Sequence, residues 1–245
     1  MSVFIFIFGL LIGSFLNVCI YRIPRAESIA FPPSHCTNCN HRIEFYDLLP
    51  VVSYLFLRGK CRECGTKISL RYPLVEVFTG VIVFLLYLKY GFSFLWIKYT
   101  LLAFWVIVIG LIDFDTTDIY VSTTASGIGL AFLFIIIDIV SGVNIGNNIL
   151  GGVIGGGTIS LIILLTKGMG WGDAELFLLG GLFMGYQLTL VAIVLSFVLG
   201  AIVSIVLILL HKKTRKDYIP FAPYISMAIL ISVLYGDKIL QFYLP

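Results

Sequence analysis

The chain has 245 residues, of which 60% are hydrophobic and only 12% are charged, and its mean hydropathy is +1.06. Soluble globular proteins average about 45–50% apolar and about 25% charged residues. This composition excludes a compact soluble domain, a disordered chain, a collagen and a disulfide scaffold, and it predicts a protein embedded in a lipid bilayer. The net charge of +3 says little alone, because the positions of the charges set the orientation of a membrane protein.

Apolar segments separated by short polar breaks fill most of the chain and predict an all-α, polytopic membrane protein. At about 20 residues per crossing, they provide about eight transmembrane helices. The break between the sixth and seventh is placed near Gly185, within a run that carries no charge. In chain order, the expected helices are 3–20, 74–90, 95–112, 122–140, 148–166, 174–187, 188–210 and 222–236.

Residues 21–72 are expected to form a small loop domain outside the bilayer, between helix 1–20 and a transmembrane core of residues 73–245. Half of the sixteen Lys and Arg residues lie in this loop, so the positive-inside rule places it in the cytoplasm. With eight helices, Lys167 and the basic cluster 211–216 fall on the same side. The predicted location is the bacterial cytoplasmic (inner) membrane, with both termini outside. Helix 1 is expected to be retained, because no positive charge precedes its apolar core.

Four of the five cysteines form two CxxC pairs in the loop, Cys36 with Cys39 and Cys61 with Cys64. Their spacing is close to that of a zinc ribbon. Four thiolates can hold Zn²⁺ in a closed tetrahedron, so the expected ion is structural. The alternatives are two disulfides, which rarely persist on the reducing side of a membrane, or four unbound thiols. Cys19 is expected to be a small buried side chain of the first helix.

Ionisable side chains in membrane segments are costly and therefore functional candidates. Asp113 ends the third expected helix and Asp173 opens the sixth, and the topology places both at the cytoplasmic boundary. Two facing carboxylates can act on a bound water as general base and general acid, and so hydrolyse an amide. The alternative interpretation is that the acids cap helices, since Asp173 stands directly before Ala174.

Several further residues are weaker candidates. The glycines before Asp173 are expected to let an extended substrate approach the acid. Glu76, just inside the second helix, is expected either to pair with Arg71 or to serve a second site. Asp138, near the outer end of the fourth helix, is likewise a weaker candidate for a functional residue. The residues expected to contact substrate or support the pair are Gly170, Gly172, Asp115 and Glu175.

Glycines at 151, 152, 155, 156 and 157 form small-xxx-small pairs that allow membrane helices to approach closely. Packing is therefore favoured over a phosphate-binding loop as the role of this run, with helix flexibility near the active site as the alternative.

Short motifs follow one another in a fixed order along the chain. They are Gly13-Ser-Phe-Leu-Asn17, Arg22-Ile-Pro24, the two CxxC pairs, Leu49-Pro-Val-Val-Ser-Tyr54, Gly59-Lys-Cys61, Arg71-Tyr-Pro-Leu-Val-Glu76, Ile112-Asp113, Gly170-x-Gly172-Asp173 and Pro220-Phe-Ala-Pro-Tyr224. No single motif is decisive, but in this order they make the chain resemble type IV prepilin peptidases over nearly its whole length.

The resemblance implies an intramembrane aspartic protease of the GxGD kind. Such enzymes cut the basic leader from prepilins or pseudopilins at the cytoplasmic face, in type IV pilus or type II secretion systems. Members with this loop usually also methylate the new N-terminal amine with S-adenosylmethionine. Asp113 and Asp173 would then be the catalytic pair and the four loop cysteines the metal ligands. The methylation site has no visible sequence fingerprint beyond the weak candidate Glu76, and no nucleic-acid partner is expected.

Two positions depart from the family pattern. A Pro followed by Asp or Asn often comes soon after the first aspartate, whereas this chain has Ile119-Tyr120-Val121. The Lys usual two places after the second aspartate is Glu175. The alternative function is an ion-coupled membrane transporter with a zinc-binding regulatory loop. The clustering of the acids at one face of the membrane argues against it.

Overall fold

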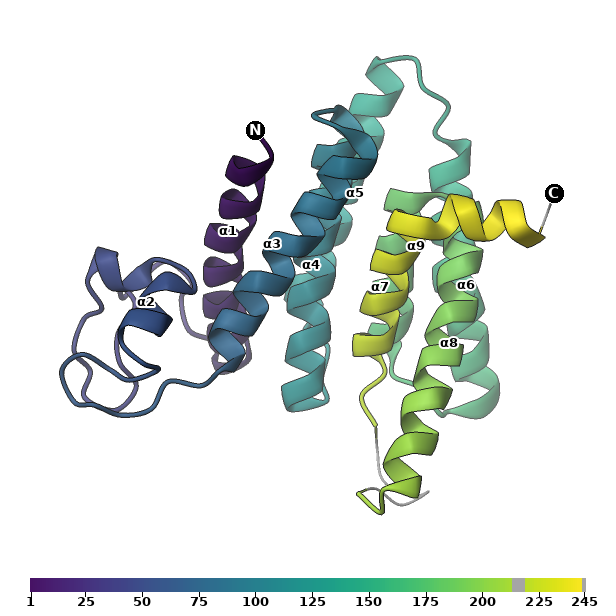
Figure 1. The fold of residues 1–245 in the computed structure, drawn as a ribbon. Coiled ribbons are helices and arrows are strands. Elements are labelled where there is room, and N and C mark those ends of the chain that lie inside the picture. The colour runs from purple at the N-terminus through teal and green to yellow at the C-terminus, as the bar shows by residue number, and fades with distance from the viewer. Residues whose placement is uncertain (213–218, 244–245) are drawn as a thin grey trace. The chain divides into compact units, whose positions relative to one another are not determined.

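The computed structural model describes residues 1–212 and 219–243, and within these residues it contains helices and no β-strand. The all-α class is therefore confirmed, and each of the eight predicted segments corresponds to a helix (Figure 1). The helices are α1 Ser2–Arg22, α2 Val52–Phe56, α3 Arg71–Tyr90, α4 Phe94–Thr116, α5 Val121–Val140, α6 Gly146–Thr166, α7 Trp171–Met184, α8 Tyr186–Leu209 and α9 Ala222–Tyr243, with short 3₁₀ turns at Ile23–Arg25 and Phe45–Leu48.

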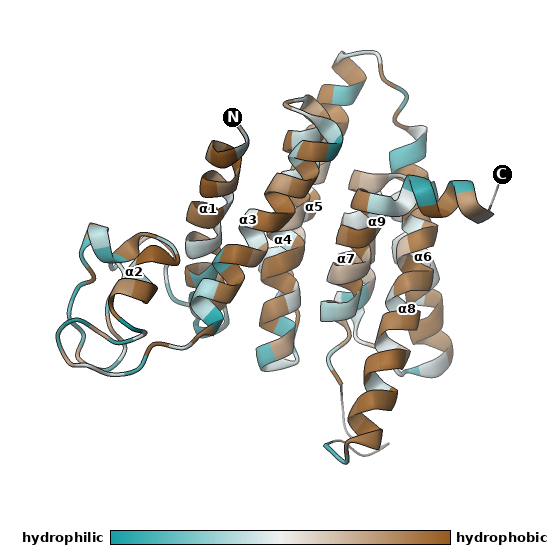
Figure 2. Cartoon of the chain, in the orientation of Figure 1, coloured by the Kyte–Doolittle hydropathy of each residue, from teal (hydrophilic) through white to brown (hydrophobic). Residues whose placement is uncertain are grey.

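Seven helices in the described part of the chain are long and apolar enough to cross a bilayer, which makes this a multi-pass membrane protein. The remaining predicted crossing is α7, whose 14 residues span only about 21 Å, against a hydrocarbon core of about 30 Å. The predicted break at Gly185 is confirmed, because this residue has φ +79° and separates α7 from α8. Figure 2 shows hydrophobic residues along the helices and hydrophilic residues concentrated in the loop around α2.

The chain divides into two compact units, residues 1–96 and 97–245. In the first unit, α1 packs against α3 with backbones in contact. A Cβ added to Gly9 would lie 2.7 Å from Cα of Gly80, and one added to Gly13 would lie 2.7 Å from Cα of Glu76. The absence of side chains at these positions therefore sets the spacing of the two helices.

In the second unit, the glycine run predicted to pack does so, against α7. A Cβ on Gly151 would lie 2.4 Å from the carbonyl oxygen of Gly181, and one on Gly155 would lie 2.6 Å from that of Phe177. Asn148 adds hydrogen bonds from its amide nitrogen to the last carbonyls of α7. The packing interpretation is confirmed, and α7 is held closely although it is short.

A buried ion pair joins α4 to α5. The ammonium Nζ of Lys98 lies 3.0 Å from Oδ2 of Asp138, and both residues are buried. Charges inside a membrane protein are tolerated when they pair. Asp138, a weaker functional candidate in the sequence, therefore has a structural partner in Lys98.

Removing one charge of this pair should destabilise the protein more than removing both. We expect Lys98→Met to lower the free energy of unfolding by about 3–5 kcal/mol, because Asp138 would remain buried without a partner. The double variant Lys98→Met/Asp138→Leu should recover most of this loss. Thermal unfolding of the purified chain in detergent measures both effects. A double variant as unstable as Lys98→Met would contradict the explanation.

Candidate functional site

The two CxxC pairs form matching turns in the loop of the first unit. In the first turn, the N–H of Cys36 donates to the carbonyl oxygen of His41, and the N–H of Asn40 donates to that of Cys36, both at 2.9 Å. In the second turn, the N–H of Cys61 donates to the carbonyl oxygen of Thr66 at 2.9 Å, and the N–H of Gly65 donates to that of Cys61 at 3.0 Å. The residue after each second cysteine, Asn40 or Gly65, has a positive φ, of 55° or 70°. Asn and Gly suit this conformation better than most residues.

These turns bring four sulfur atoms together. The Sγ atoms of Cys36, Cys39, Cys61 and Cys64 all lie within 4.8 Å of one another, and those of Cys36 and Cys64 are 3.8 Å apart. A tetrahedral ion with metal–sulfur bonds of about 2.3 Å places its sulfurs about 3.8 Å apart. The cysteines are free thiols, not disulfides. The predicted cluster is confirmed as a group that can hold a metal ion.

The surroundings favour the charged form of two of the four sulfurs, those of Cys64 and Cys36, whereas desolvation and the neighbouring thiols raise the pKa of Cys39 to about 11. Hydrogen bonding by Thr66 lowers the pKa of Cys64 to about 6. Hydrogen bonds from backbone N–H groups, first that of Cys39, lower the pKa of Cys36. Because the thiolate is the form that binds metal, these contacts prepare the loop for an ion.

Asp113 lies in the second unit, where the end of α4 meets the beginning of α9. Its side chain is buried, with the residue 3% exposed, and Oδ2 accepts a hydrogen bond of 3.0 Å from the N–H of Ala222. Gly110 lies one turn earlier, and a Cβ there would be 2.7 Å from Oγ of Ser226. Close packing at Gly110 thus positions the acid against a helix N-terminus, whose first N–H groups lack intrahelical partners.

Asp173 lies in the first turn of α7 and is 4% exposed. Its Oδ2 accepts a hydrogen bond of 3.2 Å from the N–H of Gly170, the N-cap residue. The structure therefore does not place Asp173 as an N-cap before Ala174: Asp173 occupies the third helical position, and its side chain binds the N–H of the N-cap residue Gly170. Both acids are thus buried and held by a backbone N–H, one at the end of α4 and the other in the first turn of α7.

Gly172 makes a contact that the sequence did not reveal. A Cβ on Gly172 would lie 2.5 Å from Cβ of Ile119, in the segment that connects α4 to α5. At Gly170, the nearest atom to such a Cβ is Oδ2 of Asp173, at an ordinary 3.8 Å. The close approach expected at Gly172 is therefore made by the protein's own Ile119.

The two remaining candidates in this region differ in their surroundings. Glu175 is half-buried on α7, and its carboxylate hydrogen-bonds with the hydroxyl of the buried Thr124 on α5. Asp115 is exposed on the last turn of α4. Ala222 and Thr124 were not predicted as site residues. The expected helix 222–236 was the one signal for Ala222, since it placed that residue at the start of a helix.

Glu76 lies in the first unit, near the start of α3, and is buried. Its Oε2 accepts a hydrogen bond of 2.8 Å from the N–H of Val51. Val51 precedes α2 and has φ +60°, which is rare for a β-branched residue. The side chain of Glu76 is thus held by a hydrogen bond from the backbone of the loop.

Comparison with known proteins agrees with this division of the chain. Residues 7–90 match the bacterial peptidase A24 N-terminal domain, and residues 100–205 match the type IV leader peptidase family. The chain is 33% identical to a prepilin leader peptidase/N-methyltransferase of Pseudomonas putida, covering 95% of this chain and 90% of the relative.

Relatives of the same name occur in Aeromonas hydrophila, 34% identical over 98% of this chain and 92% of the relative, and in Bacillus subtilis, 31% identical over 98% and 96%. The chain belongs to the type IV leader peptidase family. No solved structure matches it. The leader peptidase match contains Asp113 and Asp173, whereas the four clustered cysteines and Glu76 fall in the N-terminal match.

Metal binding should require the clustered cysteines and not the fifth. We expect Cys36→Ser and Cys61→Ser each to abolish stoichiometric metal, because a three-sulfur site loses a ligand of the closed tetrahedron. Cys19→Ser, which changes a buried cysteine of α1, should keep the metal. Elemental analysis of the purified proteins measures this. Full metal content in Cys36→Ser would show that the cluster is not the site.

Substitution of two neighbouring glycines should have unequal effects. We expect Gly172→Ala to lower the free energy of unfolding by about 1–3 kcal/mol through overpacking against Ile119. Gly170→Ala should be nearly neutral, because its Cβ has room. Adding Ile119→Ala to Gly172→Ala should restore part of the loss. Thermal unfolding compares the variants, and equal losses in the two single variants would contradict this account.

Proposed function

We propose that Asp113 and Asp173 are the catalytic pair with which this chain removes the basic leader peptide from prepilins or pseudopilins. The observation that carries the proposal is the burial of both carboxylates, on α4 and α7, each held by a backbone N–H at the beginning of a helix, within the segment that matches the leader peptidase family. The relatives' name, prepilin leader peptidase/N-methyltransferase, supplies the substrate class and a second activity, N-methylation.

Two interacting acids that share one proton can cleave an amide without a covalent intermediate. The charged carboxylate takes a proton from a bound water, which attacks the peptide carbonyl carbon. The protonated carboxylic acid gives its proton to the departing amine nitrogen. The N–H groups of Ala222 and Gly170 each hold one oxygen of an acid, so both side chains are fixed before the substrate arrives. Burial keeps bulk water from competing for these bonds.

Glu175 and Asp115 are proposed as supporting residues of this site. Glu175 fixes α7 against α5 through Thr124, which helps to hold the first turn that carries Asp173. The exposed Asp115 adds negative charge at the end of α4 and would attract a positively charged leader. The transporter alternative finds no support in the family matches.

The loop is proposed to bind zinc and to lie in the cytoplasm. Four thiolates at tetrahedral spacing are a common structural zinc site, and the sulfur separations fit that ion. The domain assignment follows: 1–20 as the first transmembrane helix, 21–72 as the zinc loop, and 73–245 as the peptidase core. The proposed methyl donor is S-adenosylmethionine.

The proposed orientation rests on the basic residues of the loop and on the positive-inside rule. It places the loop on the cytoplasmic side of the bacterial inner membrane. Of the second basic cluster used in that prediction, His211 and Lys212 are described, whereas Lys213, Arg215 and Lys216 lie outside the described residues.

Loss of either aspartate charge should abolish leader cleavage. We expect Asp113→Asn and Asp173→Asn each to reduce the cleavage rate more than about 100-fold, since each removes a proton-transferring group. Asp237→Asn, at an exposed position on α9, is the matched control and should cleave normally. The assay incubates each purified variant with a prepilin in detergent and follows the shortened product by mass spectrometry. Wild-type cleavage by either catalytic variant would overturn the assignment.

A further inference from the structure

The loop of the first unit carries large apolar side chains on its surface. They belong to the uncharged run 48–57, which contains α2, and to the 3₁₀ turn before it (Figure 2). Val52, Leu55 and Phe56 share one helix face by their i, i+3, i+4 spacing, and all three are exposed, Phe56 to 83%. Phe45 is 80% exposed in the 3₁₀ turn, which packs against α2. These four side chains are called the α2 face. Large apolar groups gathered on a surface mark contact with a protein or a membrane.

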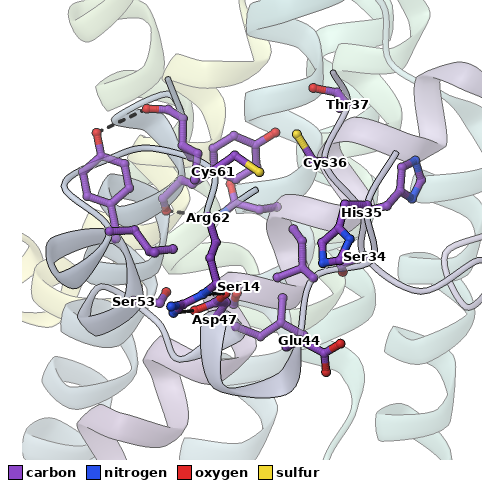
Figure 3. A pocket seen from close by; sticks show the side chains of 18 of the residues that line it. Ser14, Ser34, His35, Cys36, Thr37, Glu44, Asp47, Ser53, Cys61 and Arg62 are labelled. Carbon is purple, nitrogen blue, oxygen red and sulfur yellow. Dashed lines mark hydrogen bonds and ion pairs between the residues drawn. The ribbon is translucent and has the colours of Figure 1, made fainter. Parts of the chain in front are cut away.

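The opposite side of α2 faces the long helices of the same unit. Ser53 of α2 and Ser14 of α1 both line a cavity of about 590 Å³ between the loop, α1 and α3 (Figure 3). The N–H of Val51, directly before α2, donates to Glu76 of α3, which also hydrogen-bonds with Ser14. These contacts hold α2 with one side toward α1 and α3 and leave the α2 face on the surface.

The same contacts place α2 beside the membrane helices and not beyond their ends. Both α1 and α3 are long and apolar enough to cross a bilayer, and α1 ends at Arg22. Ser14 lies about two turns before that end, which is about 12 Å at a rise of 1.5 Å per residue. An interfacial helix buries its apolar face about 5–10 Å into the boundary between headgroups and acyl chains. In Figure 1, α2 accordingly lies beside the C-terminal half of α1, at a level where lipid surrounds that helix.

The backbone around α2 is suited to this depth. The N–H groups of Ser53, Leu55 and Leu57 donate to carbonyl oxygens within the same segment. That of Val51 donates to the side chain of Glu76. Lipid tails offer no hydrogen bonds, so a segment that enters them must satisfy its backbone inside the protein. This segment does so with bonds that need no water.

Positive charge accompanies the α2 face. Arg58 and Lys60 follow shortly after α2, and Lys67 lies opposite Lys60 in an antiparallel bridge. All three are exposed, and no acidic residue lies between Leu48 and Lys60. Lys and Arg residues close to a bilayer attract its anionic headgroups. Large apolar side chains next to positive charge are typical of segments that lie in a membrane interface, and this charge favours lipid over an uncharged apolar partner.

We propose that the α2 face lies in the headgroup–acyl boundary of the leaflet at which α1 ends, with Arg58, Lys60 and Lys67 on anionic lipid headgroups. The partner of this surface is the bilayer itself, and α2 is an interfacial anchor of the loop. Because Val51 binds Glu76, the anchor also sets the level of the loop against α1 and α3. This contact with lipid depends neither on leader cleavage nor on methylation.

The first test measures whether water reaches the α2 face. The purified full chain is placed one copy per nanodisc, in lipid that contains phosphatidylglycerol, and hydroxyl radicals label the side chains that water reaches. We expect Phe56 to be labelled no more than Phe15, an exposed residue of the membrane helix α1. Phe31 is the matched aqueous control, because it is 75% exposed and precedes Pro32, which Arg22 binds at the end of α1. Labelling of Phe56 at the level of Phe31 overturns the proposal.

Protein partners give a different result in the same experiment. One copy per nanodisc excludes cover by a second chain, and no other protein is present. Protection of Phe56 under these conditions therefore supports lipid as the partner. Protection that appears only after a prepilin is added would assign the α2 face to the substrate and overturn the lipid assignment.

The basic residues are tested with a lipid that carries a photoactivatable group near its headgroup. In phosphatidylglycerol bilayers we expect adducts on residues 45–57 of the wild type, and a lower yield in Arg58→Gln/Lys60→Gln, since the attraction to anionic headgroups is reduced. Arg42→Gln, an exposed basic residue of another turn of the loop, should keep the wild-type yield. Neutral phosphatidylcholine should remove the difference between the wild type and the double variant.

Metal content of each variant reports that the loop is folded. Adducts confined to the long helices overturn the anchor. Equal yields from the wild type and the double variant in phosphatidylglycerol overturn the role of the basic residues.

Discussion

Each of the three central carboxylates is held by a backbone N–H at the beginning of a helix. Asp113 accepts from Ala222, the first residue of α9. Asp173 accepts from the N-cap residue of α7, and Glu76 from the N-cap residue of α2. The first N–H groups of a helix have no intrahelical acceptor, and the helix dipole favours negative charge there. A buried acid and an unpaired N–H thus satisfy each other where water is scarce, and the proposed catalytic pair depends on this arrangement.

Glycine contacts bring these helix beginnings within reach of the acids. Gly110 allows α9 to approach α4 one turn before Asp113, and Gly172 admits Ile119 beside Asp173. In the first unit, Gly13 brings α1 against the backbone of Glu76. A Cβ at Gly13 would lie 2.7 Å from the backbone Cα of Glu76. A Cβ at Gly110 or Gly172 would lie 2.7 or 2.5 Å from side-chain atoms of Ser226 or Ile119, so at each position the neighbour would have to shift. These glycines therefore act on the three acids through the spacing of the neighbouring chain segments.

Hydropathy and cysteine spacing could predict much of this structure because both depend on short stretches of sequence. The apolar runs predicted the eight helical segments, of which α7 is short. The CxxC pairs predicted the sulfur cluster. The other features depend on residues far apart in the chain. The partnership of Lys98 with Asp138, the N–H of Ala222 on Asp113 and the contact of Thr124 with Glu175 arise from helix packing. A single sequence carries no local signal for such pairs, so Asp138 was taken for a functional candidate.

The contacts tie the two groups of candidate residues to different elements. Asp113 and Asp173 lie on α4 and α7 and accept hydrogen bonds from the beginnings of α9 and α7. Glu76 accepts a hydrogen bond from Val51 of the loop, in which four cysteines lie together and Arg62 donates to Asp47. A metal ion held by those cysteines would therefore stabilise the loop that positions Glu76.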